Sequence, residues 1–181
     1  GLNYDPETEI TVMSGAAEAI GVIMLTMMNF GEEIIVPSPF FSAYKEQAII
    51  AGVKLVEVPV RLDEDWELNV DRIREAITDK TSMILINSPN NPAGYVLDRD
   101  NLTRIADLAK ERDLMVISDE CYDEFVYGQE HISIATLPDM RERTLVVKST
   151  SKQFSMTGWR IGYILGPENA IKYLNKVHQN F

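Results

Sequence analysis

Seven short apolar runs alternate along this chain with stretches of helical periodicity, and this alternation restricts the possible folds more than any other feature. The runs lack the polar alternation of a half-exposed strand, so they predict a sheet that helices cover on both faces. Strands that alternate with helices in this way are typical of a mostly parallel sheet, and we therefore expect an α/β fold in one domain. The expected strands span residues 9–14, 33–37, 54–60, 82–87, 114–120, 144–149 and 160–166.

Helical patterns fill the intervals between these runs. Gly52 is expected to close one helix, and Asn69 is expected to cap the start of another. Ligands bind beyond the carboxyl ends of the strands in sheets of this kind, so the residues that follow each strand are the candidates for a site. The expected helices span residues 16–30, 41–52, 69–77, 98–113 and 169–181.

Charge and composition exclude several classes of partner. Acidic residues outnumber basic ones 28 to 17, and the resulting formal charge of −11 disfavours DNA, RNA and anionic membranes, although it permits a local cationic pocket. The single cysteine, Cys121, cannot form an internal disulfide, which indicates a reducing compartment such as the cytoplasm. His131 and His178 lack the spacing of metal ligands, so no zinc site is expected. The apolar run 19–30 is too short to span a bilayer.

Small or turn-forming residues follow two of the expected strands. Gly15, Ala16 and Ala17 begin a helix after the first strand, where small side chains would leave backbone N–H groups open to an anion. Alternatively, these small residues serve only to form a tight turn between the strand and the helix. In the segment "SPNNPAG" after the fourth strand, Asn90 and Asn91 either cap a rigid turn or reach a ligand.

Charged and hydroxyl side chains follow the next strands. Asp119 ends an apolar strand, and a buried carboxylate there would need a partner. It either caps the next short helix or pairs with a cationic nitrogen of a cofactor, and Tyr122 would place its hydroxyl nearby. After the sixth strand, Lys152 is either a surface charge or an amine nucleophile activated by desolvation and neighbouring charge. Arg160 carries a planar fork that suits a phosphate, and Ser149 adds a hydroxyl.

These residue types match one cofactor when they are taken together. A helix start, a hydroxyl and an arginine suit a phosphate, an aspartate suits a pyridinium nitrogen, and a lysine suits an aldehyde. Pyridoxal phosphate carries all three groups, and a lysine Schiff base with an acidic or arginine partner to the ring nitrogen is typical of proteins that bind it.

Three motifs resemble those of a class I aminotransferase of the aspartate and aromatic group, within fold type I of the pyridoxal-phosphate enzymes. They are "SPNNPAG" (88–94), "ISDECYDEFVY" (117–127) and "STSKQFSMTGWRIGY" (149–163), and "VMSGAAEAI" and "IVPSPFFSAY" agree more loosely. The resemblance implies a three-layer sandwich in which residues 1–181 form a single large domain that binds the cofactor. It also implies that an N-terminal segment and a C-terminal small domain of the family lie outside this sequence.

The resemblance also implies a role for each candidate residue. Lys152 would form the internal aldimine and move the substrate proton, and Asp119 would keep the pyridinium nitrogen protonated. Tyr122 and Asn91 would contact the phenolate oxygen of the ring. Tyr44 either lines the same wall or is an ordinary core aromatic residue. The phosphate would lie between Ser149, Arg160 and the helix start at Gly15, Ala16 and Ala17, and Phe41 would stack on the ring where relatives often carry Trp or Tyr.

The implied reaction is transfer of an amino group between an L-amino acid, of aspartate or aromatic type, and a 2-oxo acid. Two alternatives use the same scaffold: a carbon–sulfur β-lyase, and a cofactor-binding regulatory domain. The family binds the substrate carboxylate with an arginine of the small domain, so no residue here is given that role and the isolated chain need not turn over. The resemblance further implies that the full-length protein is a homodimer.

Overall fold

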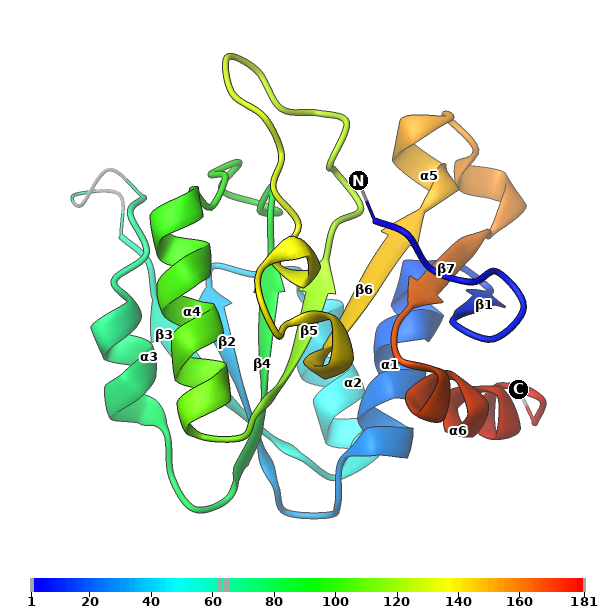
Figure 1. Ribbon diagram of the computed structural model, residues 1–181, viewed down its shortest axis with the longest axis horizontal. Coiled ribbons are helices and arrows are strands. Elements are labelled where there is room, and N and C mark those ends of the chain that lie inside the picture. Colours follow the sequence, from blue (N-terminus) through cyan, green and yellow to red (C-terminus); the bar gives the residue numbers. More distant parts are fainter. Residues whose placement is uncertain (1, 62, 64–65, 181) are drawn as a thin grey trace.

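A seven-stranded sheet forms the centre of the protein in a computed structural model that describes residues 2–61, 63 and 66–180 (Figure 1). The order across the sheet is β1–β7–β6–β5–β4–β2–β3. All neighbouring pairs from β6 to β3 are parallel, whereas β7 runs antiparallel to both β6 and β1. The predicted α/β class with a mostly parallel sheet is therefore confirmed. The strands are β1 (Ile10–Met13), β2 (Glu33–Ser38), β3 (Lys54–Pro59), β4 (Thr81–Asn87), β5 (Met115–Asp119), β6 (Thr144–Ser149) and β7 (Gly162–Leu165).

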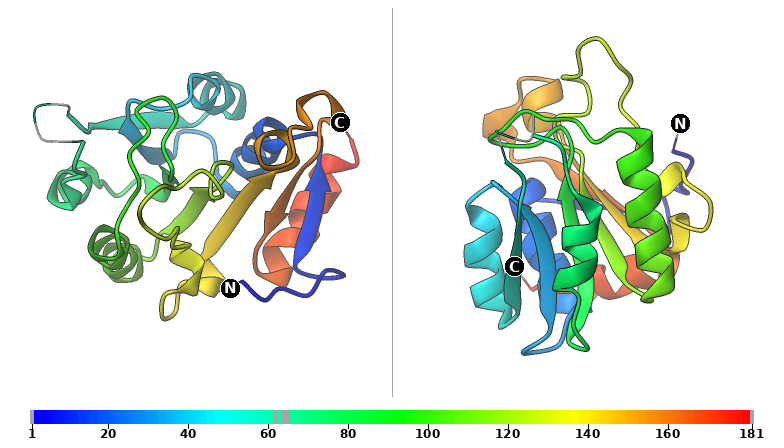
Figure 2. Two further views of the ribbon diagram at one scale, coloured as in Figure 1. Left: turned by 90° about the horizontal axis from the view of Figure 1, so that it is seen from above. Right: turned by 90° about the vertical axis from the view of Figure 1, so that its left-hand side faces the viewer.

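Helices cover both faces of this sheet, as the edge-on view in Figure 2 shows. One layer contains α1 (Ala16–Met27), α2 (Ala43–Ala51) and α6 (Glu168–His178), and the other contains α3 (Val70–Ala76) and α4 (Arg99–Glu111). A short helix, α5 (Thr150–Gln153), follows β6 above the carboxyl edge of the sheet. None of the described helices is long and apolar enough to cross a membrane.

Each central strand contributes apolar side chains to both helix layers. In β4, Met83 and Leu85 pack in the core beneath α1 and α2, whereas Ile84 and Ile86 pack in the core beneath α3 and α4. Because consecutive side chains of a strand point to opposite faces, a strand buried on both faces must be apolar at every position. This is the physical reason for the uninterrupted apolar runs in the sequence.

Local chemistry sets the ends of the helices. Gly52 closes α2 in the left-handed conformation with φ of 70°, and the Asn69 side chain accepts a hydrogen bond from the Asp71 N–H at the start of α3, so both predicted caps are confirmed. The first helix is shorter than the predicted 16–30. Its last residue is Met27, because Asn29 and Glu32 bond to each other in a turn that leads into β2.

The last strand is also shorter than the predicted 160–166. Arg160 adopts a left-handed conformation with φ of 52°, which is incompatible with a strand, and β7 begins at Gly162 instead. The expected final helix begins at Glu168 and ends at His178. These differences move the ends of elements, and all seven predicted strands are present, whereas the short helix α5 was not predicted.

Candidate active site

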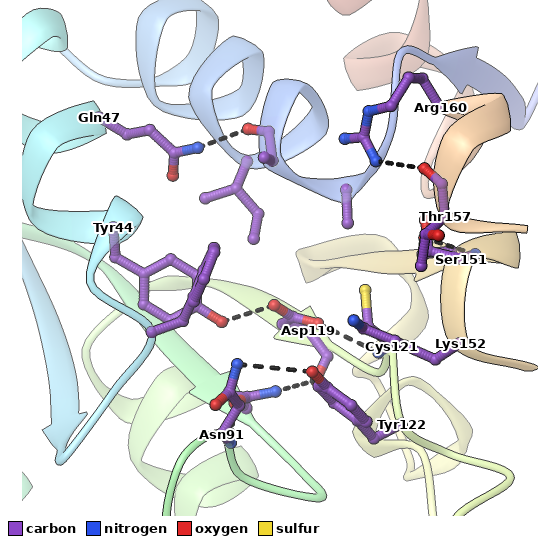
Figure 3. A pocket seen from close by; sticks show the side chains of 16 residues that line it. Tyr44, Gln47, Asn91, Asp119, Cys121, Tyr122, Ser151, Lys152, Thr157 and Arg160 are labelled. Carbon is purple, nitrogen blue, oxygen red and sulfur yellow. Dashed lines mark hydrogen bonds between the residues drawn. The ribbon is translucent and has the colours of Figure 1, made fainter. Parts of the chain in front are cut away.

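A pocket of about 310 Å³ opens where β4, β5 and β6 end and α1 begins (Figure 3). This is the carboxyl edge of the parallel strands, where sheets of this type bind ligands. Nine of the ten candidate residues line it, and the tenth, Gly15, lies against the Arg160 guanidinium. The candidates in the wall are Ala16, Ala17, Phe41, Asn91, Asp119, Tyr122, Ser149, Lys152 and Arg160, and the other lining residues are Ile20, Tyr44, Gln47, Asn87, Cys121, Ser151 and Thr157.

Asp119 lies on the floor of the pocket as the last residue of β5, and only 6% of it is exposed. Its Oδ2 accepts a hydrogen bond of 2.5 Å from the Tyr44 hydroxyl, and its Oδ1 accepts one of 3.1 Å from the Cys121 N–H. Burial raises the pKa of the Asp119 carboxyl, although these two hydrogen bonds oppose the shift. Within the described residues no lysine or arginine forms an ion pair with this carboxyl. The pocket therefore offers a buried carboxylate, held by neutral donors, to a cationic group.

Tyr44 is the most important residue whose role the sequence left open. It is 1% exposed in the first turn of α2, and its ring packs against Phe40 and Phe41 with centroids 6.1 Å and 5.8 Å away. Burial and the charge of Asp119 raise the pKa of the Tyr44 hydroxyl well above its usual value, so it remains protonated and donates. Tyr44 is thus both a core aromatic residue and the side-chain partner of Asp119. Its position one turn after Phe41 was the available signal.

Arg160 and the start of α1 meet at one side of the pocket. A Cβ built on Gly15 would lie 2.4 Å from Nη2 of Arg160, so the guanidinium rests directly on the glycine backbone. Gly15 has a φ of 86°, and among the described residues no side chain caps the first N–H groups of α1. Arg160 also donates through Nη1 to the Thr157 carbonyl at 3.2 Å. A guanidinium beside uncapped N–H groups and a positive helix end is suited to a phosphate.

Lys152 projects from α5 on the side of the pocket opposite α2. Its Nζ lies 5.9 Å from the centre of the Tyr122 ring. The Tyr122 hydroxyl lies 3.5 Å from Nδ2 of Asn91, and burial raises the pKa of this hydroxyl. The amine, the phenol and the amide thus surround one region of the pocket above Asp119.

The two neighbouring asparagines have different positions. Asn90 donates to the Pro39 carbonyl at 3.1 Å and accepts from the Ala93 N–H at 2.9 Å, so it stabilises the turn. Asn91 points into the pocket. Asn87, which the sequence analysis did not single out, braces this arrangement because it accepts from the Asn91 N–H at 2.7 Å and donates to the Asp119 carbonyl at 3.1 Å.

Two serines precede Lys152 in the pocket wall. Ser149 caps α5 by accepting from the Ser151 N–H at 3.1 Å, and its hydroxyl lies 3.4 Å from the Ile161 carbonyl. Ser151 was not among the candidates, although it lines the pocket and is 8% exposed. On the opposite wall, Phe41 is 39% exposed and offers an aromatic face.

The family model described as aminotransferase class I and II matches residues 1–181. The chain is 44% identical over 176 residues to an aspartate aminotransferase of Pyrococcus abyssi, covering 97% of this chain and 45% of that protein. It is also 44% identical over 169 residues to aromatic-amino-acid aminotransferase 2 of Thermococcus litoralis, covering 93% and 43%.

A solved structure of an aminotransferase has the same fold as this chain. The aromatic aminotransferase from Pyrococcus horikoshii OT3 superposes with a TM-score of 0.96 at 44% identity, over 99% of this chain and 48% of that chain. The chain therefore spans about half the length of the curated relatives that it matches.

Proposed function

Because the chain belongs to the family of class I and II aminotransferases, we propose that it forms the pyridoxal-phosphate-binding domain of an enzyme that transfers an amino group between an L-amino acid and a 2-oxo acid. One observation carries the proposal. Asp119 at the end of β5 meets Lys152 and Arg160, which lie on the segment between β6 and β7, around a single pocket at the carboxyl edge of the sheet.

The donor set of the pocket fits the cofactor. When bound, pyridoxal phosphate supplies an aldehyde that condenses with amines and a ring that withdraws electrons from the substrate carbon. The Asp119 carboxylate would hold a proton at the ring nitrogen, since it is buried and pairs with no other cation in the described part of the chain. Tyr44 and the Cys121 N–H would keep that carboxylate ionised and oriented.

The other residues would anchor the phosphate and the ring. Arg160, Ser149 and the first N–H groups of α1, at Ala16 and Ala17, would bind the phosphate, with Gly15 allowing the guanidinium to approach. Phe41 would cover one face of the ring.

Lys152 would be the catalytic amine. Its Nζ is the primary amine that would hold the cofactor through its aldehyde, and it would hold and move a proton beside the amino acid's α-carbon. Tyr122 would donate its hydroxyl to the phenolate oxygen of the ring, because its raised pKa keeps it protonated, and Asn91 would donate to the same oxygen.

The substrate class and the setting of the whole protein are also proposals. Relatives named for aspartate and for aromatic amino acids favour one of these two substrate types. The single cysteine, free and buried, suits the reducing cytoplasm. Residues 1–181 would form the large domain of a homodimer, as the family resemblance implies.

Reductive labelling tests the proposal directly. The whole protein that contains this chain is mixed with pyridoxal phosphate, reduced with borohydride, digested and analysed by mass spectrometry. We expect a pyridoxyl group on the peptide that contains Lys152, because this amine lies in the pocket with the groups that would bind the phosphate and the ring.

A Lys152→Arg variant is the matched control, since it keeps the charge but loses the primary amine. It should remain unlabelled at this peptide. Labelling spread over lysines outside the pocket such as Lys45, at equal extent in both proteins, would contradict the proposal. If Lys152 is labelled, an assay of amino-group transfer to 2-oxoglutarate, with aspartate or an aromatic amino acid as donor, would identify the substrate class.

A further inference from the structure

A buried polar network lies on the face of the sheet opposite to the pocket, directly behind Asp119. We call it the Glu120 network, and its members are Glu120, Asp123, His131, Ser133 and Lys148. Consecutive residues of a strand point to opposite faces. Asp119 and Ser149 therefore face the pocket, whereas the neighbouring Glu120 and Lys148 project to the other side.

Glu120 is the centre of the network and is 1% exposed. Its Oε1 accepts a hydrogen bond of 2.9 Å from the Ser118 hydroxyl and a second bond from the Ser133 hydroxyl. Its Oε2 lies 3.1 Å from Nε2 of His131 and 3.4 Å from Nζ of Lys148. Burial alone would raise the pKa of this carboxyl, but His131, Lys148 and Ser133 together lower it, so Glu120 remains charged.

Lys148 connects two carboxylates from its position on β6. Its Nζ pairs with Glu120 and also with Asp123, and the side chains of both Lys148 and Asp123 are less than one-fifth exposed. Burial alone would lower the pKa of Lys148, but the two carboxylates raise it. A buried charge of this kind is tolerated only when it is paired, so loss of one partner leaves the others uncompensated.

The network holds the turn that carries two proposed active-site residues. Between β5 and residue 125, the Glu120 N–H bonds to the Val147 carbonyl at 2.9 Å and the Asp123 N–H bonds to the Glu120 carbonyl at 3.2 Å. Asp119 and Tyr122 point from this turn into the pocket. Glu120 and Asp123 point away from it and attach the turn to β6 through Lys148.

The same network also holds both ends of a long loop. The loop rises above the carboxyl edge of the sheet between β5 and η2 (Ile134–Thr136), as Figure 1 shows. Asp123 contacts Lys148 at its start, and His131 and Ser133 contact Glu120 at its end. Lys148 and the buried carboxylate of Glu120 therefore hold the turn in place and join the two ends of the loop.

We propose that Lys148 and Glu120 are positioning residues, which set the place of Asp119 and Tyr122 in the pocket through the turn between them. This inference rests on the proposed function, because it assigns the network to the same cofactor site. Neither residue lines the pocket, so any effect on cofactor binding must pass through the backbone, either of residues 119–123 or of β6, where Lys148 precedes Ser149.

The first test measures hydrogen exchange in the cofactor-free whole protein. In a Lys148→Met variant, we expect the amides of Cys121, Asp123 and Phe125 to exchange about tenfold faster, because they are protected by bonds within the turn. Lys148→Arg should restore most of the protection. Unchanged exchange at these amides, or an equal increase throughout the sheet, would overturn the proposal.

Lys54→Met is the matched control. Lys54 pairs at 2.9 Å with Glu33, which is also buried, but this pair lies at the opposite, amino-terminal edge of the sheet. The control should increase exchange near Glu33 and leave the turn protected. If Lys148→Met does not fold, Glu120→Gln keeps the size of the side chain and removes only its charge, and the same local increase in exchange is expected.

A cofactor measurement separates this proposal from the proposed function. The dissociation constant of pyridoxal phosphate should increase about tenfold in Lys148→Met, be restored in Lys148→Arg and be unchanged in Lys54→Met. Equal affinity in Lys148→Met and the native protein, with normal labelling of Lys152, would refute the positioning role and leave the proposed function intact. Absence of labelling in the native protein would refute the proposed function, and the exchange data would still decide whether the network holds the turn.

Discussion

The hydrogen bond between Tyr44 and Asp119 allows a quantitative test of how the pocket holds its buried carboxylate. The substitution Tyr44→Phe removes one hydroxyl and leaves the ring in place against Phe40 and Phe41. Asp119 then keeps the hydrogen bond from the Cys121 N–H, and the Cys121 thiol also stabilises the ionised carboxylate.

The expected cost follows from burial and charge. Hydrogen bonds to charged groups contribute about 1.5–3 kcal/mol, and this bond is 2.5 Å long between two residues that are each at most 6% exposed. Since 1.4 kcal/mol is tenfold in an equilibrium constant, the unfolding constant at neutral pH should increase by roughly 10- to 150-fold. The pKa of Asp119 should also rise further, because one of the groups that stabilise its ionised form is lost.

Urea unfolding of the cofactor-free protein measures this cost, and a double-mutant cycle with Asp119→Asn isolates it. The neutral amide accepts a weaker hydrogen bond, so Tyr44→Phe should cost about 1 kcal/mol or less in that background. Tyr4→Phe is the control, because the Tyr4 hydroxyl is also buried but has no hydrogen-bond partner within the described residues. This control should leave stability unchanged or raise it slightly.

Two results would refute the reasoning. A loss below about 0.5 kcal/mol in Tyr44→Phe would mean that the hydroxyl contributes no charge-assisted bond. An equal loss in the background with Asp119 and in the background with Asn at that position would mean that the cost does not depend on the charge of the carboxylate.

Three further outcomes are expected. Arg160→Lys should weaken pyridoxal phosphate binding about tenfold in equilibrium dialysis, because a point charge replaces a planar fork. Gly15→Ala should weaken it too and lower stability by about 1 kcal/mol, since φ is 86° and the new Cβ would meet the Arg160 guanidinium; unchanged binding would contradict this geometry. The hydrogen bond from Lys54 lowers the pKa of Glu33 in the folded protein. The contribution of ionised Glu33 to folding stability is therefore complete above the ordinary glutamate pKa and is lost as pH falls through the pKa of Glu33 in the folded state. The stability difference between native protein and Glu33→Gln should therefore shrink from pH 7 to pH 3.

The sequence predicted the sheet class and the main site residues because both depend on local patterns. Apolar runs buried on two faces mark the strands, and Asp119 and Ser149 end two of them. In a parallel sheet the carboxyl ends of such strands share one edge. We can therefore predict that residues distant in the chain meet there without knowing how the helices pack.

Contacts between segments were harder to predict. The bond from Tyr44 depends on how α2 lies on the sheet, and the pairing of Lys148 with Glu120 depends on the register of β6 against β5. A single sequence specifies neither. The alternation along β5 nevertheless carried a usable signal, because the residue after a pocket-facing Asp119 must point to the other side.

The reversal of β7 has a consequence for the tolerance of the site to change. Because β7 runs back beside β6, Ser149 pairs with Gly162, and the Thr150 N–H bonds to the Ile161 carbonyl at 3.1 Å. Lys152 and Arg160 thus lie on one segment, between β6 and β7, whose two ends are joined by these contacts. The conformation of this segment therefore sets the distance between them. If β5 shifted slightly against β6, Lys152 and Arg160 would move together relative to Asp119. Such a shift would tilt a bound ring but would leave the distance between Lys152 and Arg160 unchanged.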